Sequence, residues 1–245
     1  MPTIYLSPST QEFNPYITGG NEEYYMNLIA DAMEPYLRSS GIQFTRNTPD
    51  MTAASSIRAS NAGNYDLHVA LHSNASPESL AGQLRGSDVY YYPTSTSGRR
   101  LAEITANNLR SIYPLPDLVR TLSTTSIGEV ARTRAPAILI EYAYHDNVQD
   151  ANWITANIDS IARNTVLSLT EYFGIPLVPP IPRGTGTVRT QGGRLNIRSR
   201  PSMDAPVIAQ VNNGEPITVL GQWNNWYTVD YWGVVGYASS DYIQF

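Results

Sequence analysis

Cysteine is absent from this 245-residue chain, and histidine occurs only three times. Without cysteine the chain forms no disulfide and has no thiolate for catalysis, and its absence fits an intracellular or an extracellular working place equally. No apolar run approaches the ~20 residues that span a bilayer, and the N-terminus has neither the basic start nor the apolar stretch of a signal peptide. The net charge of -5 is mild and includes no basic stripe, which argues against nucleic acid as a partner.

The length of the chain favours two domains, since one domain typically has roughly 100 to 200 residues. An apolar fraction of 42 % with 15 % charged residues is typical of a folded protein. The stretch IPLVPPIPRGTG from Ile175 contains four prolines and two glycines, which disfavour a helix or a central strand. We therefore predict a larger domain over residues 1–174, a semi-stiff linker over 175–184 and a smaller domain over 185–245.

Strand and helix patterns alternate along residues 1–174. TIYLS (3–7) is typical of a strand, a helical pattern runs from Asn21, a plausible N-cap, to Gly41, and IQFTR (42–46) is again typical of a strand. The same patterns predict further helices over 51–61, 97–112 and 148–173, and further strands over 66–72, 86–93 and 137–142. This order predicts an α/β domain with a mostly parallel, twisted sheet flanked by helices.

Residues 185–245 consist of short strand-like segments separated by Gly, Asn and Pro, which predicts a small all-β barrel. Aromatic side chains are concentrated in this stretch, and a domain of this size is too small to bury all of them. Exposed aromatic grooves bind peptides well, and we expect about half of these rings to lie in the core and the rest at the surface.

The three histidines lie at or beside the ends of apolar strands. His72 closes the strand DLHVALH, while Glu141 and His145 follow the strand AILI. Catalytic groups of open α/β sheets gather beyond the carboxyl ends of the strands, so we expect a site there. The Cα atoms of His68 and His72 would lie ~13 Å apart in a strand that rises ~3.3 Å per residue, so only one of them can bind a given metal ion. We choose His72 and expect His68 to have a structural or supporting role.

Several segments resemble the zinc-dependent N-acetylmuramoyl-L-alanine amidases of the amidase-3 family. YDLHVALHSNA resembles the metal-binding strand of that family, and GGNEEYYMNLIADAM resembles the helix that opens with a ligating glutamate, which the register of NLIA places at Glu23 rather than Glu22. FTRNTPD, IRASNAG and PAILIEYAYHDN resemble, in order, the strand after that helix, an Arg-Asn helix and the strand that ends in the catalytic glutamate, here Glu141. The resemblance covers nearly all of residues 3–173. It implies hydrolysis by zinc-activated water, with Glu141 as general base and then general acid.

The first strand departs from the family pattern. The family has a Gly-His-Gly turn that carries a zinc histidine, whereas this chain has YLSPSTQEFN. His145 is the chemically better replacement, because imidazole binds zinc more readily than an amide, and Gln11 is the replacement by position. We therefore predict a Zn²⁺ site made of Glu23, His72 and His145, with Gln11 as the alternative third ligand. A wall-binding protein with an inactive site is a further possibility.

The C-terminal stretch resembles a bacterial SH3-like domain, with LNIRSRPS as its most specific segment. The resemblance implies binding to the peptide stems or cross-bridges of peptidoglycan, the bacterial cell wall. A tether of this kind raises the effective concentration of an enzyme at an insoluble substrate. The aromatic candidates for wall contact are Trp223, Trp226, Tyr227, Trp232 and Tyr237.

These resemblances predict a peptidoglycan hydrolase that cleaves the amide between N-acetylmuramic acid and the L-alanine of the stem peptide. A zinc peptidase acting on the stem or cross-bridge is the alternative enzyme, because a fold does not fix the bond that is cut. Since no signal peptide is recognised, we expect the protein to reach the wall as a phage endolysin released by a holin-like route, by non-classical secretion, or as an autolysin released on lysis or sporulation.

Overall fold

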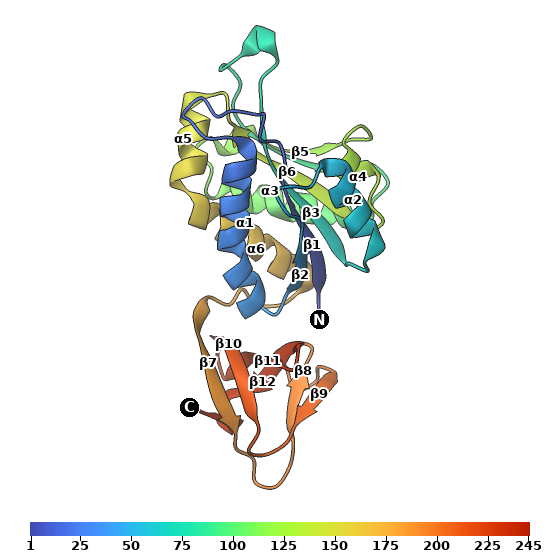
Figure 1. Cartoon of the computed structure of the whole chain (residues 1–245), viewed down its shortest axis with the longest axis vertical. Coiled ribbons are helices and arrows are strands. Elements are labelled where there is room, and N and C mark those ends of the chain that lie inside the picture. Colours follow the sequence, from blue (N-terminus) through green and yellow to red (C-terminus); the bar gives the residue numbers. More distant parts are fainter. The chain divides into compact units, whose positions relative to one another are not determined.

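The computed structural model describes residues 1–245 apart from the side chain of Arg183. The chain divides into two compact units (Figure 1). One carries a six-stranded sheet and the other a seven-stranded sheet. The first unit comprises Thr3–Met33 and Phe44–Tyr172, and the second comprises Met1–Pro2, Glu34–Gln43 and Phe173–Phe245.

The six-stranded sheet has the order β2-β1-β3-β6-β4-β5. Its strands are β1 (Thr3–Pro8), β2 (Gln43–Arg46), β3 (Leu67–Asn74), β4 (Ser87–Tyr91), β5 (Val119–Ser123) and β6 (Ala137–Tyr144). Strands β1, β3 and β6 pair in parallel, β4 pairs with β6 in antiparallel sense, and β5 pairs with β4 in parallel. The predicted α/β domain with a mostly parallel sheet is confirmed, and β5 is a strand that the sequence patterns did not indicate.

The central strands are buried on both faces, as expected for a parallel sheet covered by helices. Val69 and Ala70 of β3, which point to opposite faces of the sheet, are fully buried, and so are Leu71 of β3 and Ile140 of β6. Helices flank the sheet (Figure 1), namely α1 (Glu22–Ser39), α2 (Ala53–Ala62), α3 (Thr96–Arg110), α4 (Gly128–Ala131), α5 (Val148–Ala156) and α6 (Ile158–Phe173). None of the described helices is long and apolar enough to cross a bilayer.

Capping residues define the ends of several helices. The side chain of Asn21 accepts a hydrogen bond from the backbone N–H of Tyr24 at 2.8 Å, which is the N-cap contact predicted for α1. The single helix predicted over 148–173 is wrong, because α5 ends at Ala156 and α6 begins at Ile158. Asn157 stands between them with φ -126° and ψ 25°, and its side-chain amide donates to the carbonyl of Trp153 at 2.7 Å. That bond satisfies a carbonyl of the last turn of α5 and allows the chain to change direction.

The second sheet is wholly antiparallel and has the order β13-β7-β10-β11-β12-β8-β9. Its strands are β7 (Pro180–Val188), β8 (Leu195–Arg198), β9 (Val207–Val211), β10 (Pro216–Trp223), β11 (Trp226–Tyr231), β12 (Val234–Ser239) and β13 (Ile243–Gln244). The predicted small all-β module is confirmed. Because β7 begins at Pro180, half of the stretch predicted as linker is strand.

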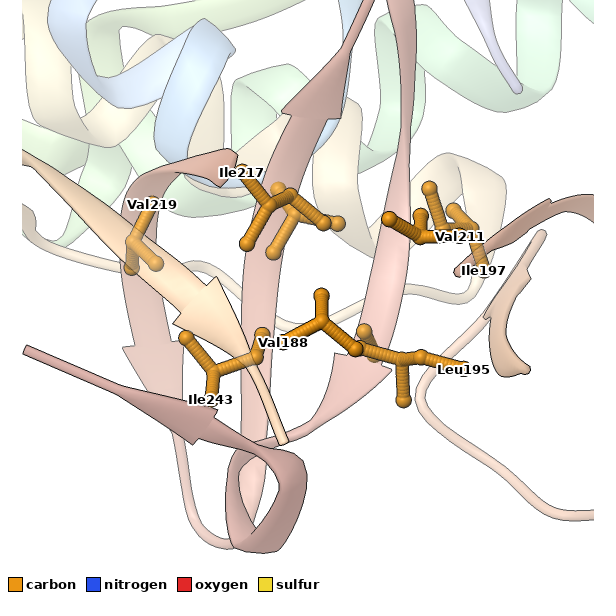
Figure 2. Close-up of a cluster of buried hydrophobic side chains, with 9 residues drawn as sticks. Val188, Leu195, Ile197, Val211, Ile217, Val219 and Ile243 are labelled. Carbon is orange, nitrogen blue, oxygen red and sulfur yellow. The ribbon is translucent and has the colours of Figure 1, made fainter. Parts of the chain in front are cut away.

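Alternate residues of these strands form one apolar core. Figure 2 shows side chains from β7, β8, β9, β10 and β13 turned toward one another. The labelled members are Val188, Leu195, Ile197, Val211, Ile217, Val219 and Ile243, each at most 6 % exposed. The module therefore has a core of its own, and full burial of each such side chain stabilises it by roughly 1.5 to 3 kcal/mol.

Candidate active site

The predicted site lies where β1, β3 and β6 end side by side. Pro8 of β1 is in register with Leu71 of β3, and His72 of β3 is in register with Glu141 of β6. The carboxyl ends of these parallel strands therefore meet at one edge of the sheet, as ligand sites of open α/β sheets do.

Two side chains meet the Nδ1 atom of His72. Oε1 of Glu22 lies 2.8 Å from this nitrogen, and Nε2 of Gln11 lies 3.3 Å from it. The side-chain amide of Asn14 donates to Oε1 of Gln11 at 3.1 Å and to Oε2 of Glu22 at 2.7 Å. The loop after β1 and the first turn of α1 are thus bound together around one edge of the imidazole.

The structure brings Glu22, and not Glu23, to His72. Glu22 is 1 % exposed and also accepts a hydrogen bond from the backbone N–H of Ser73 at 3.3 Å. Glu23 is only partly buried, and partial burial together with the charge of Glu12 raises the pKa of its carboxyl. Neighbouring residues of a helix point about 100° apart, so only one of two adjacent glutamates can face the strand ends. The resemblance-based register selected the other one.

A second carboxylate, Glu129, holds the opposite edge of the same imidazole. Its Oε2 lies 2.9 Å from Nε2 of His72, while its Oε1 lies 3.2 Å from Nε2 of His68 and accepts a hydrogen bond from the hydroxyl of Ser7. Burial disfavours the charge of Glu129, but the hydrogen bonds from the two imidazoles outweigh burial and hold its pKa well below the usual range. Sequence reasoning missed this residue, because it lies in the four-residue helix α4, outside every motif.

The two carboxylates make His72 a site for positive charge. Burial lowers the pKa of the imidazole, yet the hydrogen bonds to Glu129 and Glu22 dominate and raise it well above 6.5. The buried pair of acids therefore favours a protonated ring, with one N–H directed at each carboxylate. A metal ion could replace the Nδ1 proton, because that nitrogen already faces a carboxylate oxygen and an amide.

Glu141 lies beside these groups. Its Oε2 atom is buried and has no hydrogen-bond partner among the described residues. Burial raises the pKa of Glu141 to about 8, and the charges of Glu22, Asp88 and Glu129 add to this effect against the opposing charge of His72. Asp88 itself receives two hydrogen bonds from Arg120, at 2.7 and 2.8 Å. A carboxyl with a pKa near neutrality suits proton transfer in both directions.

His145 has other partners. Its Nδ1 lies 3.0 Å from both the carbonyl oxygen and the hydroxyl of Ser73, and its ring stacks on Tyr16 with the ring centroids 5.3 Å apart. The bond to the carbonyl requires Nδ1 to donate, which leaves only Nε2 of His145 for a metal. The structure thus brings Gln11, and not His145, within hydrogen-bond distance of His72.

Comparison with protein families accounts for both parts of the chain. The model of the N-acetylmuramoyl-L-alanine amidase family matches residues 12–171, which is more than half of the chain. The chain belongs to the N-acetylmuramoyl-L-alanine amidase family. A model of the bacterial SH3 domain matches residues 193–244, and no curated protein matches the chain by sequence.

Solved amidase structures share the fold of the amidase part. AmiC2 of Nostoc punctiforme is 18 % identical with a TM-score of 0.61, and an amidase from Clostridium difficile 630 is 18 % identical with a TM-score of 0.62; each match covers 71 % of this chain and 97 % of the other. The catalytic domain of the CD27L endolysin, which targets Clostridia difficile, is 20 % identical with a TM-score of 0.57, over 70 % of this chain and 98 % of the other. At these identities the likeness shows the fold.

This amidase is an enzyme of peptidoglycan hydrolysis, and its family cleaves the amide between N-acetylmuramic acid and L-alanine. Members of the family generally depend on zinc. Among the residues that the structure describes, no group of three or more His, Cys, Asp and Glu side chains is arranged to hold a metal ion. The side chains that converge are those of His72, Glu22 and Gln11. A set of three zinc ligands at this point would therefore need the amide of Gln11.

The aromatic candidates of the SH3 module divide between core and surface. Tyr237 is fully buried and its hydroxyl donates to the carbonyl of Ser40 at 2.6 Å, while Trp226 is 7 % exposed and lines a pocket. Tyr227 is partly buried against the apolar core. Trp223 is 38 % exposed and Trp232 is 88 % exposed. The fully buried ring of Tyr237 cannot contact a polymer, so the exposed rings of Trp223 and Trp232 and the pocket lined by Trp226 are the direct candidates.

Proposed function

We propose that this amidase hydrolyses the amide with Glu22, His72 and Gln11 as ligands of a zinc ion and with Glu141 as the proton carrier. The observation that carries the proposal is the convergence of a carboxylate and a side-chain amide on Nδ1 of His72, within 2.8 and 3.3 Å. Imidazole nitrogen and carboxylate oxygen are ordinary zinc ligands. Glu22 also accepts hydrogen bonds from the side-chain amide of Asn14 and the backbone N–H of Ser73, which hold its carboxylate in this orientation.

Gln11 replaces His145 as the preferred third ligand because its side chain reaches Nδ1 of His72, at 3.3 Å. Asn14 donates to Oε1 of Gln11, so turning that oxygen toward His72 to bind a metal would break this bond and set the Gln11 NH2 against the Asn14 NH2. Imidazole is the stronger donor, but the Nδ1 atom of His145 is bonded to Ser73 and its ring is held against Tyr16. The proposed set has one weak ligand, and we expect it to bind zinc less tightly than a set with two histidines.

Glu141 supplies the proton transfers. Bound zinc would polarise the substrate carbonyl and lower the pKa of water. Glu141 takes a proton from the water that attacks the carbonyl carbon, a C–O bond forms, and the same carboxyl then protonates the leaving nitrogen as the C–N bond breaks. The products are a lactyl carboxylate on the sugar and a stem peptide with a free L-alanine amine. The buried and unpartnered Oε2 of Glu141 supports this role, because no described side chain competes for its proton.

Product analysis tests the proposal. Purified peptidoglycan is digested with the wild type, with Glu141→Gln, and with Glu103→Gln as a matched control, since Glu103 forms an exposed surface pair with Arg99. We expect new N-terminal L-alanine from the wild type and the control and at least a 1000-fold lower rate from Glu141→Gln, roughly the loss of a general acid and base. A different new N-terminus would identify a zinc peptidase instead, and binding without any lysis would identify a wall-binding protein.

We further propose that the SH3 module holds the wall through a pocket at the start of β11 and through an exposed ring that follows the other end of this strand. The pocket has a volume of about 440 Å³, and its lining includes Arg194, Arg198, Trp226 and Tyr242. Two guanidinium groups beside aromatic surface suit a peptide that carries carboxylates, as wall stems do. Trp232 presents its indole from a two-residue turn with φ of 53°, a conformation that is uncommon for a bulky residue. The exposure of this ring in a strained turn supports a binding role.

The amidase and its wall-binding module act at the cell wall. The route of delivery stays a prediction. The amidase domain resembles the catalytic domain of an endolysin, and this resemblance supports release of the protein when the producing cell lyses. Fractionation of producing cells before and after lysis, with antibody detection of the chain, would test that route.

A further inference from the structure

We propose that Tyr16 is a further catalytic residue of the amidase, whose hydroxyl donates a hydrogen bond to the oxygen of the carbonyl under attack, and that His145 positions its ring. The inference rests on the proposed function, because it concerns the same reaction. Neither role needs a metal ion. Tyr16 lies in the loop between β1 and α1, and His145 lies outside the proposed ligand set.

Buried polar atoms without a partner gather at one edge of the six-stranded sheet. Among the described residues, five buried side-chain nitrogen or oxygen atoms make no hydrogen bond. Three of them are Oη of Tyr16, Oγ of Ser76 and Oε2 of Glu141, and they belong to segments at or after the carboxyl ends of β1, β3 and β6. Buried polar groups are normally paired, so three unpaired ones at this edge indicate a place where a polar ligand binds.

Tyr16 is buried although its neighbours in the loop are not. Its side chain is 3 % exposed, whereas Pro15 and Ile17 are exposed. The backbone N–H of Tyr16 donates to the carbonyl of Gly20 at 3.1 Å, and the backbone N–H of Ile17 donates to the carbonyl of His145 at 3.0 Å. These bonds fix the loop against the segment that follows β6, so the position of the tyrosine is set before substrate binds.

The ring of His145 holds the ring of Tyr16. The two rings stack with their centroids 5.3 Å apart and an angle of 18° between their planes. Nδ1 of His145 is itself held, 3.0 Å from both the hydroxyl and the carbonyl oxygen of Ser73 at the end of β3. Tyr25 of α1 packs on Tyr16 as well, with a centroid distance of 4.6 Å. Two neighbouring rings therefore determine where the hydroxyl of Tyr16 lies.

The surroundings keep this hydroxyl a donor. Burial raises the pKa of Tyr16, and the nearby hydroxyl of Ser73, which is already bonded to His145, acts in the opposite sense. The charges of Glu22 and Glu141 add to the rise, which places the hydroxyl within electrostatic reach of both carboxylates. A neutral phenol donates well to an oxygen that gains negative charge as water adds to the carbonyl carbon. The phenol keeps its proton, because Glu141 carries out the proton transfers.

Kinetics on soluble fragments of peptidoglycan test the inference. Tyr16→Phe removes only the hydroxyl, and Tyr24→Phe makes the same change in a side chain that is 54 % exposed. We expect kcat for the release of N-terminal L-alanine to fall about 100- to 1000-fold in Tyr16→Phe with KM unchanged, and both constants to be unchanged in the control. Equal kcat values in active proteins, or a rise in KM alone, would overturn the inference and leave the proposed function intact. A wild type that releases no L-alanine would overturn both.

Thermal stability separates this role from a structural one. Because Oη of Tyr16 makes no hydrogen bond with any described residue, its removal costs the fold no bond, and Tm of Tyr16→Phe should equal or exceed that of the wild type. Calorimetry without added metal measures Tm. A lower Tm in Tyr16→Phe would identify the hydroxyl as a structural group and would overturn the inference.

A double-mutant cycle tests the positioning role of His145. His145→Ala should lower kcat about 10-fold in the wild type and much less in Tyr16→Phe, because the second protein has no hydroxyl left to position. Equal losses in the two backgrounds would show that His145 acts independently of Tyr16 and would overturn this part of the inference.

Discussion

Glu22→Gln and Glu23→Gln make the same chemical change at two adjacent positions of α1. A difference between the two variants therefore tests which glutamate belongs to the site. Glu22→Gln removes a carboxylate that lies 2.8 Å from Nδ1 of His72, whereas Glu23→Gln removes one that is only partly buried on the next position of α1. Structural zinc sites bind with about 10 to 16 kcal/mol shared by about four ligands, so one ligand is worth roughly 3 kcal/mol, or about 100-fold in Kd.

The same loss is visible as a change in thermal stability. At a fixed excess of zinc, a 100-fold weaker Kd removes about 2.7 kcal/mol of the stabilisation by the ligand. In a domain of this size each kcal/mol shifts Tm by about 2 to 4 °C, so the zinc-dependent rise in Tm should shrink by roughly 5 to 11 °C in Glu22→Gln. Calorimetry with and without zinc measures this rise, and Glu23→Gln should match the wild type. Loss of the zinc effect in Glu23→Gln but not in Glu22→Gln would refute the assignment.

Three further outcomes are expected. Gln11→Ala should lower the zinc content measured by native mass spectrometry, while His145→Ala should leave it unchanged; the reverse pattern would return His145 to the ligand set. The raised pKa of Glu141, about 8 against an ordinary 4.5, means that the folded metal-free chain holds a proton that the unfolded chain has lost. The free energy of unfolding should therefore decrease as the pH rises from about 4.5 to about 8. Denaturant titrations at several pH values should show a smaller decrease for Glu141→Gln than for the wild type. Trp232→Asn places Asn-Gly in a turn with φ of 53° and 83°, so stability should rise by about 1 kcal/mol or less while co-sedimentation with cell walls falls, and unchanged co-sedimentation would exclude a binding role for this ring.

The fold was predictable because its signals are local. Apolar strands such as LHVALH and AILI, the cap at Asn21 and the turn at Gly41 each follow from a few neighbouring residues. The break at Asn157 was missed, since the apolar period continues across it and the competing bond from its side chain to Trp153 is not a periodic feature. Strand β5 was also missed, because its two apolar residues, Val119 and Leu122, are three positions apart and do not alternate as the apolar residues of a strand do.

The sequence by itself determined the two-part organisation, the parallel sheet, and the two motif positions His72 and Glu141, because strand order and strand ends are set by hydrophobic pattern and chain length. Only the tertiary structure decided which acids surround His72. Glu22 and Glu23 are indistinguishable by residue type and helix position, and a helix rotation of about 100° separates their directions. Glu129 lies 57 positions away from His72 in the sequence, and no local pattern marks a contact that arises when α4 packs beside the strand ends.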